Sequence, residues 1–143
     1  MFLKKKNRLS KEYRVMNNIL IIEDESVTRT MYTGFIQRIA PKFQIYEAGN
    51  VLEGICLCFH KHPRLILLDM IMPAYSGKLL IDIIEEGIKN RIISFQPKII
   101  VISAIETVEE LTALTGRFSV TSVMPKPLPF DTLTEILKLH LKL

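Results

Sequence analysis

Five polar residues stand at or just after the ends of apolar stretches, and their types suit phosphate chemistry. Glu23 and Asp24 follow NNILII, and Asp69 closes LILLD. Ser103 closes KIIVIS, and Lys126 comes just after SVTSVM. Clustered carboxylates repel one another unless a cation joins them, and oxygen ligands of this kind suit a hard ion such as Mg²⁺. The sequence therefore predicts a cation site with a hydroxyl and an ammonium nearby.

These residue types also define roles in phosphoryl transfer. Magnesium prefers sites that phosphate oxygens complete, so the carboxylates imply a phosphoryl group as visitor. A carboxylate can act as nucleophile and carry an aspartyl-phosphate. Lys126 then offers a point charge to one phosphoryl oxygen, and the Ser103 hydroxyl donates a hydrogen bond to another. No general base of unusual pKa is needed, because such transfer depends mainly on positioning and charge neutralisation.

The elements that must position these residues alternate five times between strand and helix patterns. Strands are expected in NNILII, FQIYEA, LILLD, KIIVIS and SVTSVM, each followed by apolar spacing typical of a helix. This alternation favours an α/β fold with a doubly wound, five-stranded parallel sheet and helices on both faces. The functional crevice of such a sheet lies outside the carboxyl ends of the strands. We therefore expect all five polar residues at one rim.

Apolar spacing also predicts the buried face of each helix. The first helix is expected to bury residues that recur every fourth position, namely Val27, Met31, Phe35 and Ile39. The second is expected to bury Val51, Leu52, Ile55, Cys56 and Phe59. In the third, Leu79, Leu80, Ile83, Ile84 and Ile88 face inward, and the polar face carries Asp82, Glu85, Glu86 and Lys89.

Charge is distributed unevenly along the 143 residues, a length that suits one domain. The net charge is +4, but residues 1–17 contribute +5 and the remainder −1. We therefore predict a basic, flexible N-terminal extension over residues 1–17 and a domain over 18–143. The extension could touch nucleic acid or an anionic membrane surface. A lone basic run is weakly specific, so a solvated tail is the favoured interpretation, and Met16 is itself a plausible start.

Several other classes of protein are disfavoured. No apolar run is long enough to span a membrane, and the basic opening lacks the apolar region of a secretory signal. Cys56 and Cys58 are too close in sequence to bridge distant parts of the chain, which fits a reducing cytoplasm. Together with His60 and His62 they could suggest a metal site, but on one short helix these side chains point in different directions.

In the motifs ILIIEDE, LLDMIMPAYSG, VISA and MPKP, the chain resembles the receiver domain of bacterial two-component response regulators. The resemblance extends from about Asn18 to the C-terminus. The resemblance implies a flavodoxin-like three-layer sandwich with Asp69 as phosphoacceptor. It implies Mg²⁺ bound by Glu23, Asp24, Asp69 and the backbone carbonyl of Ile71. Ser103 and Lys126 complete the catalytic set, and the Lys126–Pro127 peptide bond is expected to be cis.

The resemblance also implies partners. The phosphoryl group would come from a sensor histidine kinase or a histidine phosphotransfer protein, and a downstream protein would receive the signal. Because the chain stops at Leu143, we expect a stand-alone receiver that acts through protein contacts and is not an enzyme beyond its own phosphorylation and dephosphorylation. The alternative is a degenerate receiver that binds partners without phosphorylation. A hydrolase with an aspartyl-phosphate intermediate would need an acid where Ile71 stands, and a nucleotide switch would need a glycine-rich phosphate loop.

Two departures from the family pattern carry predictions. Val123 occupies the position three residues before Lys126, where the family usually has an aromatic side chain that swings inward on phosphorylation. A valine cannot make that swing, so the readout must differ. Ile71 and Ile105 flank the path of the hydrolytic water in the family. Two apolar side chains there predict a comparatively long-lived phosphorylated state.

Overall fold

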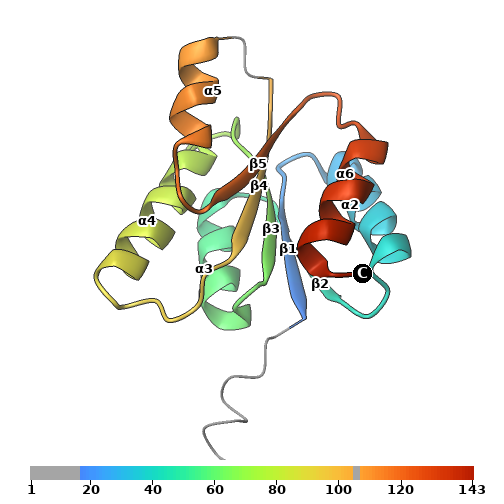
Figure 1. Cartoon of the computed structure of the whole chain (residues 1–143), viewed down its shortest axis with the longest axis horizontal. Coiled ribbons are helices and arrows are strands. Elements are labelled where there is room, and N and C mark those ends of the chain that lie inside the picture. Colours follow the sequence, from blue (N-terminus) through green and yellow to red (C-terminus); the bar gives the residue numbers. More distant parts are fainter. Residues whose placement is uncertain (1–16, 105–106) are drawn as a thin grey trace, which may run out of the picture.

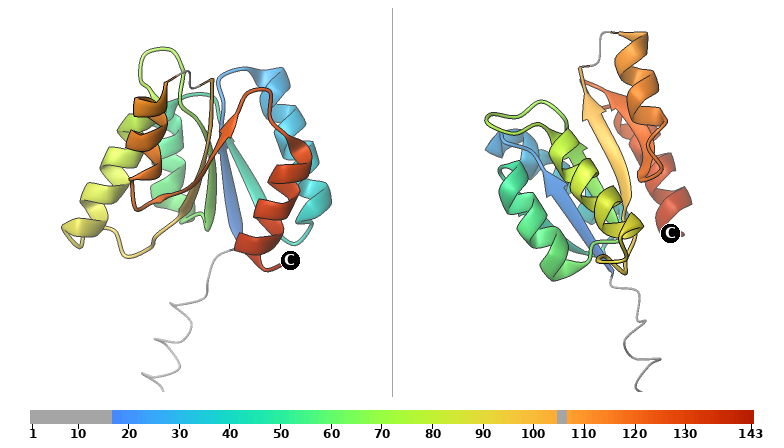
Figure 2. Two further views of the ribbon diagram at one scale, coloured as in Figure 1. Left: turned by 45° about the horizontal axis from the view of Figure 1, so that its top comes forward. Right: turned by 90° about the vertical axis from the view of Figure 1, so that its left-hand side faces the viewer.

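A computed structural model describes residues 17–104 and 107–143 as a central sheet between two layers of helices (Figure 1; Figure 2). The strands are β1 (Asn18–Ile22), β2 (Gln44–Ala48), β3 (Leu65–Asp69), β4 (Lys98–Ser103) and β5 (Val120–Pro125). All neighbouring strands run parallel, in the order β2-β1-β3-β4-β5. The predicted fold class is confirmed. Ile105 and the residues before Asn17 lie outside the described part of the chain.

The helices alternate with the strands along the chain and divide between the two faces of the sheet. They are α2 (Ser26–Ile39), α3 (Val51–Lys61), α4 (Gly77–Lys89), α5 (Val108–Thr115) and α6 (Phe130–Leu141). Side chains of α2 and α6 pack on one face, and those of α3 and α4 pack on the other. Among the helices described in residues 17–104 and 107–143, none combines the length and apolar character needed to cross a membrane.

The core has two halves because successive side chains of a strand point to opposite faces. In β1, Ile19 and Ile21 contact the α2/α6 layer, whereas Leu20 and Ile22 contact the α3/α4 layer. Every residue of β1 and β3 is buried, which explains their continuous apolar sequences. These two central strands form the rigid base of the rim at which the polar residues lie.

The predicted helix faces are partly wrong. Val27 and Met31 are 75% and 51% exposed, and α2 instead buries Tyr32 and Ile36. The buried face of α2 is therefore displaced by one residue, from Met31 and Phe35 to Tyr32 and Ile36. In α3, Cys56 was expected to be buried but is exposed, and Cys58, which was not on the expected face, is buried. Leu52 and Phe59 are also exposed, because α3 packs through Val51, Gly54 and Cys58.

Glu85 is the largest error, since it was assigned to the polar face of α4 but is buried. Its Oε1 accepts hydrogen bonds from the Ser119 backbone N–H at 3.1 Å and from the Ser119 hydroxyl at 2.7 Å. Its Oε2 accepts from Nε of Arg117 at 2.8 Å. A buried carboxylate is tolerated when its oxygens are paired in this way. The sequence contains no local signal for this pairing, because its partners lie more than thirty residues away.

Candidate functional site

The adjacent ends of β1 and β3 bring the three predicted carboxylates together. One oxygen each of Glu23, Asp24 and Asp69 lies within 4.8 Å of the other two. Glu23 and Asp69 are each only 2% exposed, whereas Asp24 faces solvent. The cluster thus has two buried carboxylates and one exposed carboxylate, Asp24, which a hydrated cation can reach from solvent.

Both oxygens of the Asp69 carboxylate are oriented by donors. The Lys126 ammonium donates to Oδ2 at 2.9 Å, and the backbone N–H of Ile71 donates to Oδ1 at 3.1 Å. The same ammonium lies 3.9 Å from Oε2 of Glu23. Burial acts to lower the pKa of Lys126, but the hydrogen bond and charge of Asp69, with the charge of Glu23, outweigh it and raise the pKa. Lys126 therefore stays cationic beside the acids.

Glu23 is held in an electrostatically unfavourable place. Burial, followed by the neighbouring Asp69 carboxylate, raises the pKa of Glu23 from 4.5 to about 7, although Lys126 opposes this shift. Its buried Oε2 also has no hydrogen-bond partner. An orphaned carboxylate oxygen is costly in a protein interior. Together with two further oxygen donors, it fits the oxygen-only ligand set of Mg²⁺, so the residues present suit this ion.

Ser103 ends β4, is buried, and follows Ile102, which pairs with Asp69 of β3. The ends of β3, β4 and β5 are tied by backbone bonds: Met70 N–H donates to Ile102 O at 3.2 Å, and Lys126 N–H donates to Ser103 O at 3.2 Å. These bonds hold the backbones of Ser103 and Lys126 next to each other. The Lys126–Pro127 peptide bond is cis, as predicted.

The loop after Asp69 returns closely to the end of β3. Gly77 N–H donates to Met70 O at 3.0 Å, and a Cβ on Gly77 would lie only 2.9 Å from the Asp69 carbonyl oxygen. Only glycine permits this approach, so Gly77 fixes where the loop after Asp69 joins α4. Ile71 lies on this loop with 66% of its surface exposed.

Arg29 is a site residue that the sequence analysis missed. From α2, its Nη1 donates to the backbone carbonyl of Glu23 at 2.7 Å, and its Nε lies 3.5 Å from Glu47 on β2. The arginine thereby holds the turn that carries Glu23 and Asp24. Its spacing five residues after Asp24 gives no sign of a contact with a backbone carbonyl, because that contact depends on how α2 packs over β1 and β2.

Comparison with known proteins identifies the family. A sequence model described as "Response regulator receiver domain" matches residues 19–138, which is most of the chain. The chain belongs to the response regulator receiver family.

Curated relatives of this receiver are longer proteins. It is 27% identical over 121 residues to "Probable C4-dicarboxylate response regulator DctR" of Priestia megaterium, covering 84% of this chain and 50% of that protein. It is 37% identical over 60 residues, or 42% of this chain, to "Cyclic di-GMP phosphodiesterase response regulator RpfG" of Xanthomonas campestris pv. campestris, covering 16% of that protein. The receiver thus spans half or less of the length of these relatives.

Solved structures resemble the receiver over almost their whole length. The N-terminal domain of an uncharacterized protein from Wolinella succinogenes has 28% identity and a TM-score of 0.75, with coverage of 87% of this chain and 94% of that one. The structure described as "signal receiver domain of putative Luxo repressor protein from Vibrio parahaemolyticus" has 22% identity and a TM-score of 0.77, with coverage of 90% of this chain and 92% of that one. The second likeness concerns the fold alone.

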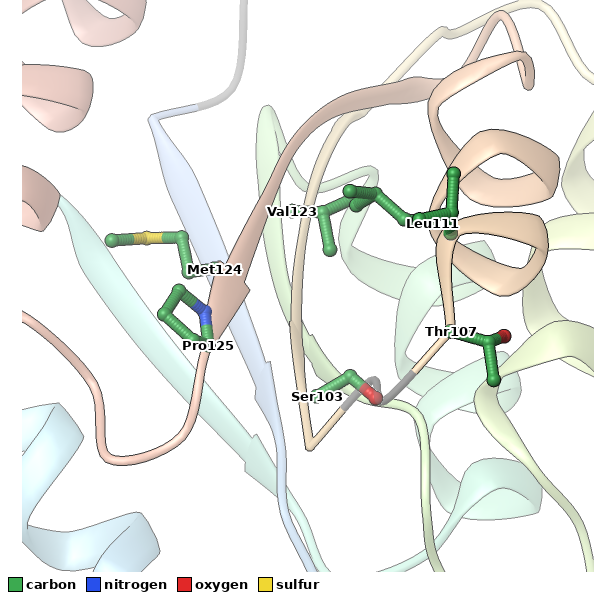
Figure 3. A pocket seen from close by; sticks show the side chains of 7 residues that line it. Ser103, Thr107, Leu111, Val123, Met124 and Pro125 are labelled. Carbon is green, nitrogen blue, oxygen red and sulfur yellow. The ribbon is translucent and has the colours of Figure 1, made fainter.

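In this receiver, Val123 lines a cavity of about 340 Å³ between α5 and β5. Figure 3 shows Ser103 at one end of this cavity, with Val123 of β5 and Leu111 of α5 at the other. An aromatic side chain at position 123 would fill part of the space. The valine therefore leaves room beside Ser103, and how a signal is read out at this position stays a prediction.

Proposed function

We propose that this receiver is a phosphorylation-controlled signalling module that accepts a phosphoryl group on Asp69. The observation that carries the proposal is the convergence of three carboxylate ligands with the Lys126 ammonium on one buried acceptor. Membership of the receiver family is consistent with phosphorylation-based signalling. The donor is a phosphohistidine of a sensor histidine kinase or phosphotransfer protein, and the output passes through contacts with a downstream protein in the cytoplasm.

The chemistry is an in-line displacement at phosphorus. A carboxylate oxygen of Asp69 attacks phosphorus while the phosphorus–nitrogen bond to the donor imidazole breaks. The imidazole leaves neutral, because its other ring nitrogen already carries a proton. When bound, Mg²⁺ would supply positive charge to the transferring phosphoryl oxygens. Glu23, Asp24, Asp69 and the backbone carbonyl of Ile71 would hold this ion. Lys126 neutralises one phosphoryl oxygen, and the Ser103 hydroxyl donates a hydrogen bond to another.

The receiver is a phosphoacceptor and not an enzyme that acts on other substrates. Only transfer onto Asp69 and hydrolysis of the resulting aspartyl-phosphate are proposed as its own chemistry. The degenerate alternative, a protein-binding module that is never phosphorylated, is disfavoured by the intact set Glu23, Asp24, Asp69, Ser103 and Lys126.

The test is incubation with Mg²⁺ and acetyl phosphate followed by intact mass measurement. We expect a gain of one phosphoryl group that disappears in Asp69→Ala and when EDTA replaces Mg²⁺. Lys126→Gln should slow the gain about a hundredfold, because the developing charge loses its fixed cation. Asp82→Asn, a carboxylate outside the site, is the matched control and should behave as the parent. If the parent gains no mass at all, the degenerate alternative replaces this proposal.

A further inference from the structure

Four segments at the edge of the sheet opposite the Asp69 rim contain Lys and Arg but no Asp or Glu. This amino-edge surface comprises the segments 40–46, 60–66, 90–99 and 136–143, which surround the starts of β2, β3 and β4 and the end of α6. These segments hold seven Lys and Arg and all three histidines of the chain, and no Asp or Glu. In Figure 1 they lie at the lower end of the molecule, where β1 also begins.

Contacts from Arg64 and Lys98 bring these segments together. Arg64 Nη2 donates to Leu141 O at 3.5 Å, and its guanidinium lies 5.7 Å from the ring centre of Phe43. Lys98 Nζ donates to His140 O at 3.4 Å. The surface is therefore one continuous region, with cations that come from separate parts of the chain.

The contacts of Lys61, Arg64 and Lys98 on this surface are with neutral groups. Lys61 lies 4.8 Å from the ring centre of Tyr46, and the bonds of Arg64 and Lys98 go to carbonyl, amide and imidazole groups. Within residues 17–104 and 107–143, no ion pair includes a cation of these four segments. Helix C-termini attract cations such as Lys61 and Lys138, but Arg64 and Lys98 stand at the starts of strands, where no helix dipole accounts for them.

The cations of the opposite rim behave differently. Arg29, Lys78 and Lys126 each pair with a carboxylate at 3.5 Å or less. Their charge is compensated inside the molecule, whereas the charge of the amino-edge surface is left for an external anion. Long unpaired cations gathered at one end create a positive potential that attracts polyanions.

Exposed aliphatic side chains accompany these cations. Ile92, Leu139 and Leu143 are 77%, 72% and 50% exposed and belong to the same segments. The aromatic rings are covered instead: Phe43 is buried, and Phe95 stacks on His62 with ring centres 4.4 Å apart. Single-stranded nucleic acid needs open aromatic platforms, and duplex DNA needs a helix or ribbon that enters a groove. A surface on which cations alternate with exposed aliphatic side chains suits a lipid headgroup region better than it suits either nucleic acid.

We propose that the amino-edge surface docks on an anionic lipid membrane and leaves the acceptor rim facing away from the bilayer. Four to eight clustered Lys and Arg are the usual recognition element for anionic headgroups. Residues 1–16 contain six further Lys and Arg and are followed directly by Asn17. The Oδ1 of Asn17 accepts a hydrogen bond from Arg64 of this surface at 3.4 Å. Docking in this orientation is independent of phosphorylation.

The test is co-sedimentation with phosphatidylcholine vesicles, with and without about 30% phosphatidylglycerol, in low and high salt. The full chain, and the chain starting at Met16, should bind only the anionic vesicles and release at about 0.5 M NaCl, where charges are screened. The triple variant Lys42→Gln, Lys98→Gln, Lys142→Gln should bind about fivefold more weakly or worse. The control Val27→Glu, Gly34→Glu, Leu52→Glu changes the net charge equally at exposed positions of α2 and α3 and should stay within about twofold of the parent.

Three results would overturn the proposal. They are equal binding by the two triple variants, complete loss of binding when the chain starts at Met16, and tighter binding to a DNA duplex than to the anionic vesicles. Circular dichroism of both variants verifies that the fold is kept. The Asp69→Ala variant should bind vesicles like the parent, so a failure here is separable from a failure of the phosphorylation proposal.

Discussion

Helices α4 and α5 cover neighbouring parts of the same face of the sheet but are held very differently. Over thirteen residues, α4 buries six, including Leu80, Ile81 and Ile84. Over eight residues, α5 buries none. The cavity beside Val123 lies on one flank of α5, and a groove of about 590 Å³, whose lining includes residues of α4, lies on the other. The loop after Asp69 thus leads into a firmly packed helix, and the neighbouring helix buries much less of its surface.

The connection after α5 is nevertheless anchored. Arg117 reaches Glu85 at 2.8 Å and Asp82 at 2.7 Å, both on α4. Burial acts to raise the pKa of Glu85, but its bonds to Ser119 and Arg117 outweigh this and lower it. Helix α5 is therefore fixed where it ends and loose along its length. Elements with little buried apolar surface are the ones that move at low energetic cost.

A matched pair of side-chain truncations tests most directly whether α4 is packed more firmly than α5. Ile84→Ala in α4 should lower the free energy of unfolding by about 2–5 kcal/mol, because it opens a cavity in the core. Leu111→Ala in α5 should cost less than about 1 kcal/mol, since Leu111 is 42% exposed. Urea unfolding monitored by circular dichroism measures both. Equal losses would show that α5 is packed as firmly as α4.

The next largest effect concerns pH and Glu23. Because its folded-state pKa is raised from 4.5 to about 7, the folded state holds this proton more tightly than the unfolded state. Its contribution to stability is fully present below pH 4.5 and is lost as pH rises through about 7. In EDTA, the parent should therefore lose about 1–3 kcal/mol relative to Glu23→Gln across this window.

Unfolding in urea at several pH values, for parent and variant side by side, gives this difference. Other titrating groups, such as Asp82, cancel in the subtraction. Saturating Mg²⁺ should flatten the difference, because the ion compensates the buried carboxylate. A difference that does not change with pH in EDTA would contradict the electrostatic description of the rim.

A smaller, kinetic effect tests the acceptor loop. Ile71 is exposed, and its aliphatic side chain cannot form a hydrogen bond with a water near Asp69. Ile71→Asn should speed loss of the phosphoryl group about tenfold, because an amide can orient the attacking water. Decay of the phosphorylated mass species after donor removal measures the rate, and Ile71→Val serves as the apolar control. The long-lived state is refuted by a rate that is the same in all three proteins.

The smallest expected effect sharpens the comparison at the cavity. Val123→Tyr should change the free energy of unfolding by less than about 1 kcal/mol, because the cavity beside α5 has room for a ring. Val101→Tyr, at a fully buried position of the neighbouring strand, should cost about 3 kcal/mol or more. Thermal and urea unfolding of the two variants give the result. A large loss at position 123 would mean that α5 cannot yield to the added ring.

The fold class, and the meeting of Glu23, Asp24 and Asp69 with Lys126 at one end of the sheet, could be predicted from the sequence. Strands with two buried faces must be continuously apolar, so β1, β3 and β4 were visible as runs ending in Glu23, Asp69 and Ser103. Parallel strands place their carboxyl ends on one edge, so residues at those ends had to converge. Helix faces were less predictable. In α2, Met31 and Tyr32 are neighbours in sequence, and either could face the sheet. Only the packing of α2 against β1 and β2 decides that Tyr32 is the buried one.

The sequence by itself therefore determined the α/β class, the rim and the residue types that meet there. The tertiary structure alone decided the energetics: the orphaned Oε2 of Glu23, the grip of Arg29 on the Glu23 carbonyl, the burial of Glu85 and the loose seating of α5. The physical reason is range. Periodicity and strand ends are set by neighbours in sequence, whereas desolvation and hydrogen bonds across elements depend on segments that meet only after folding.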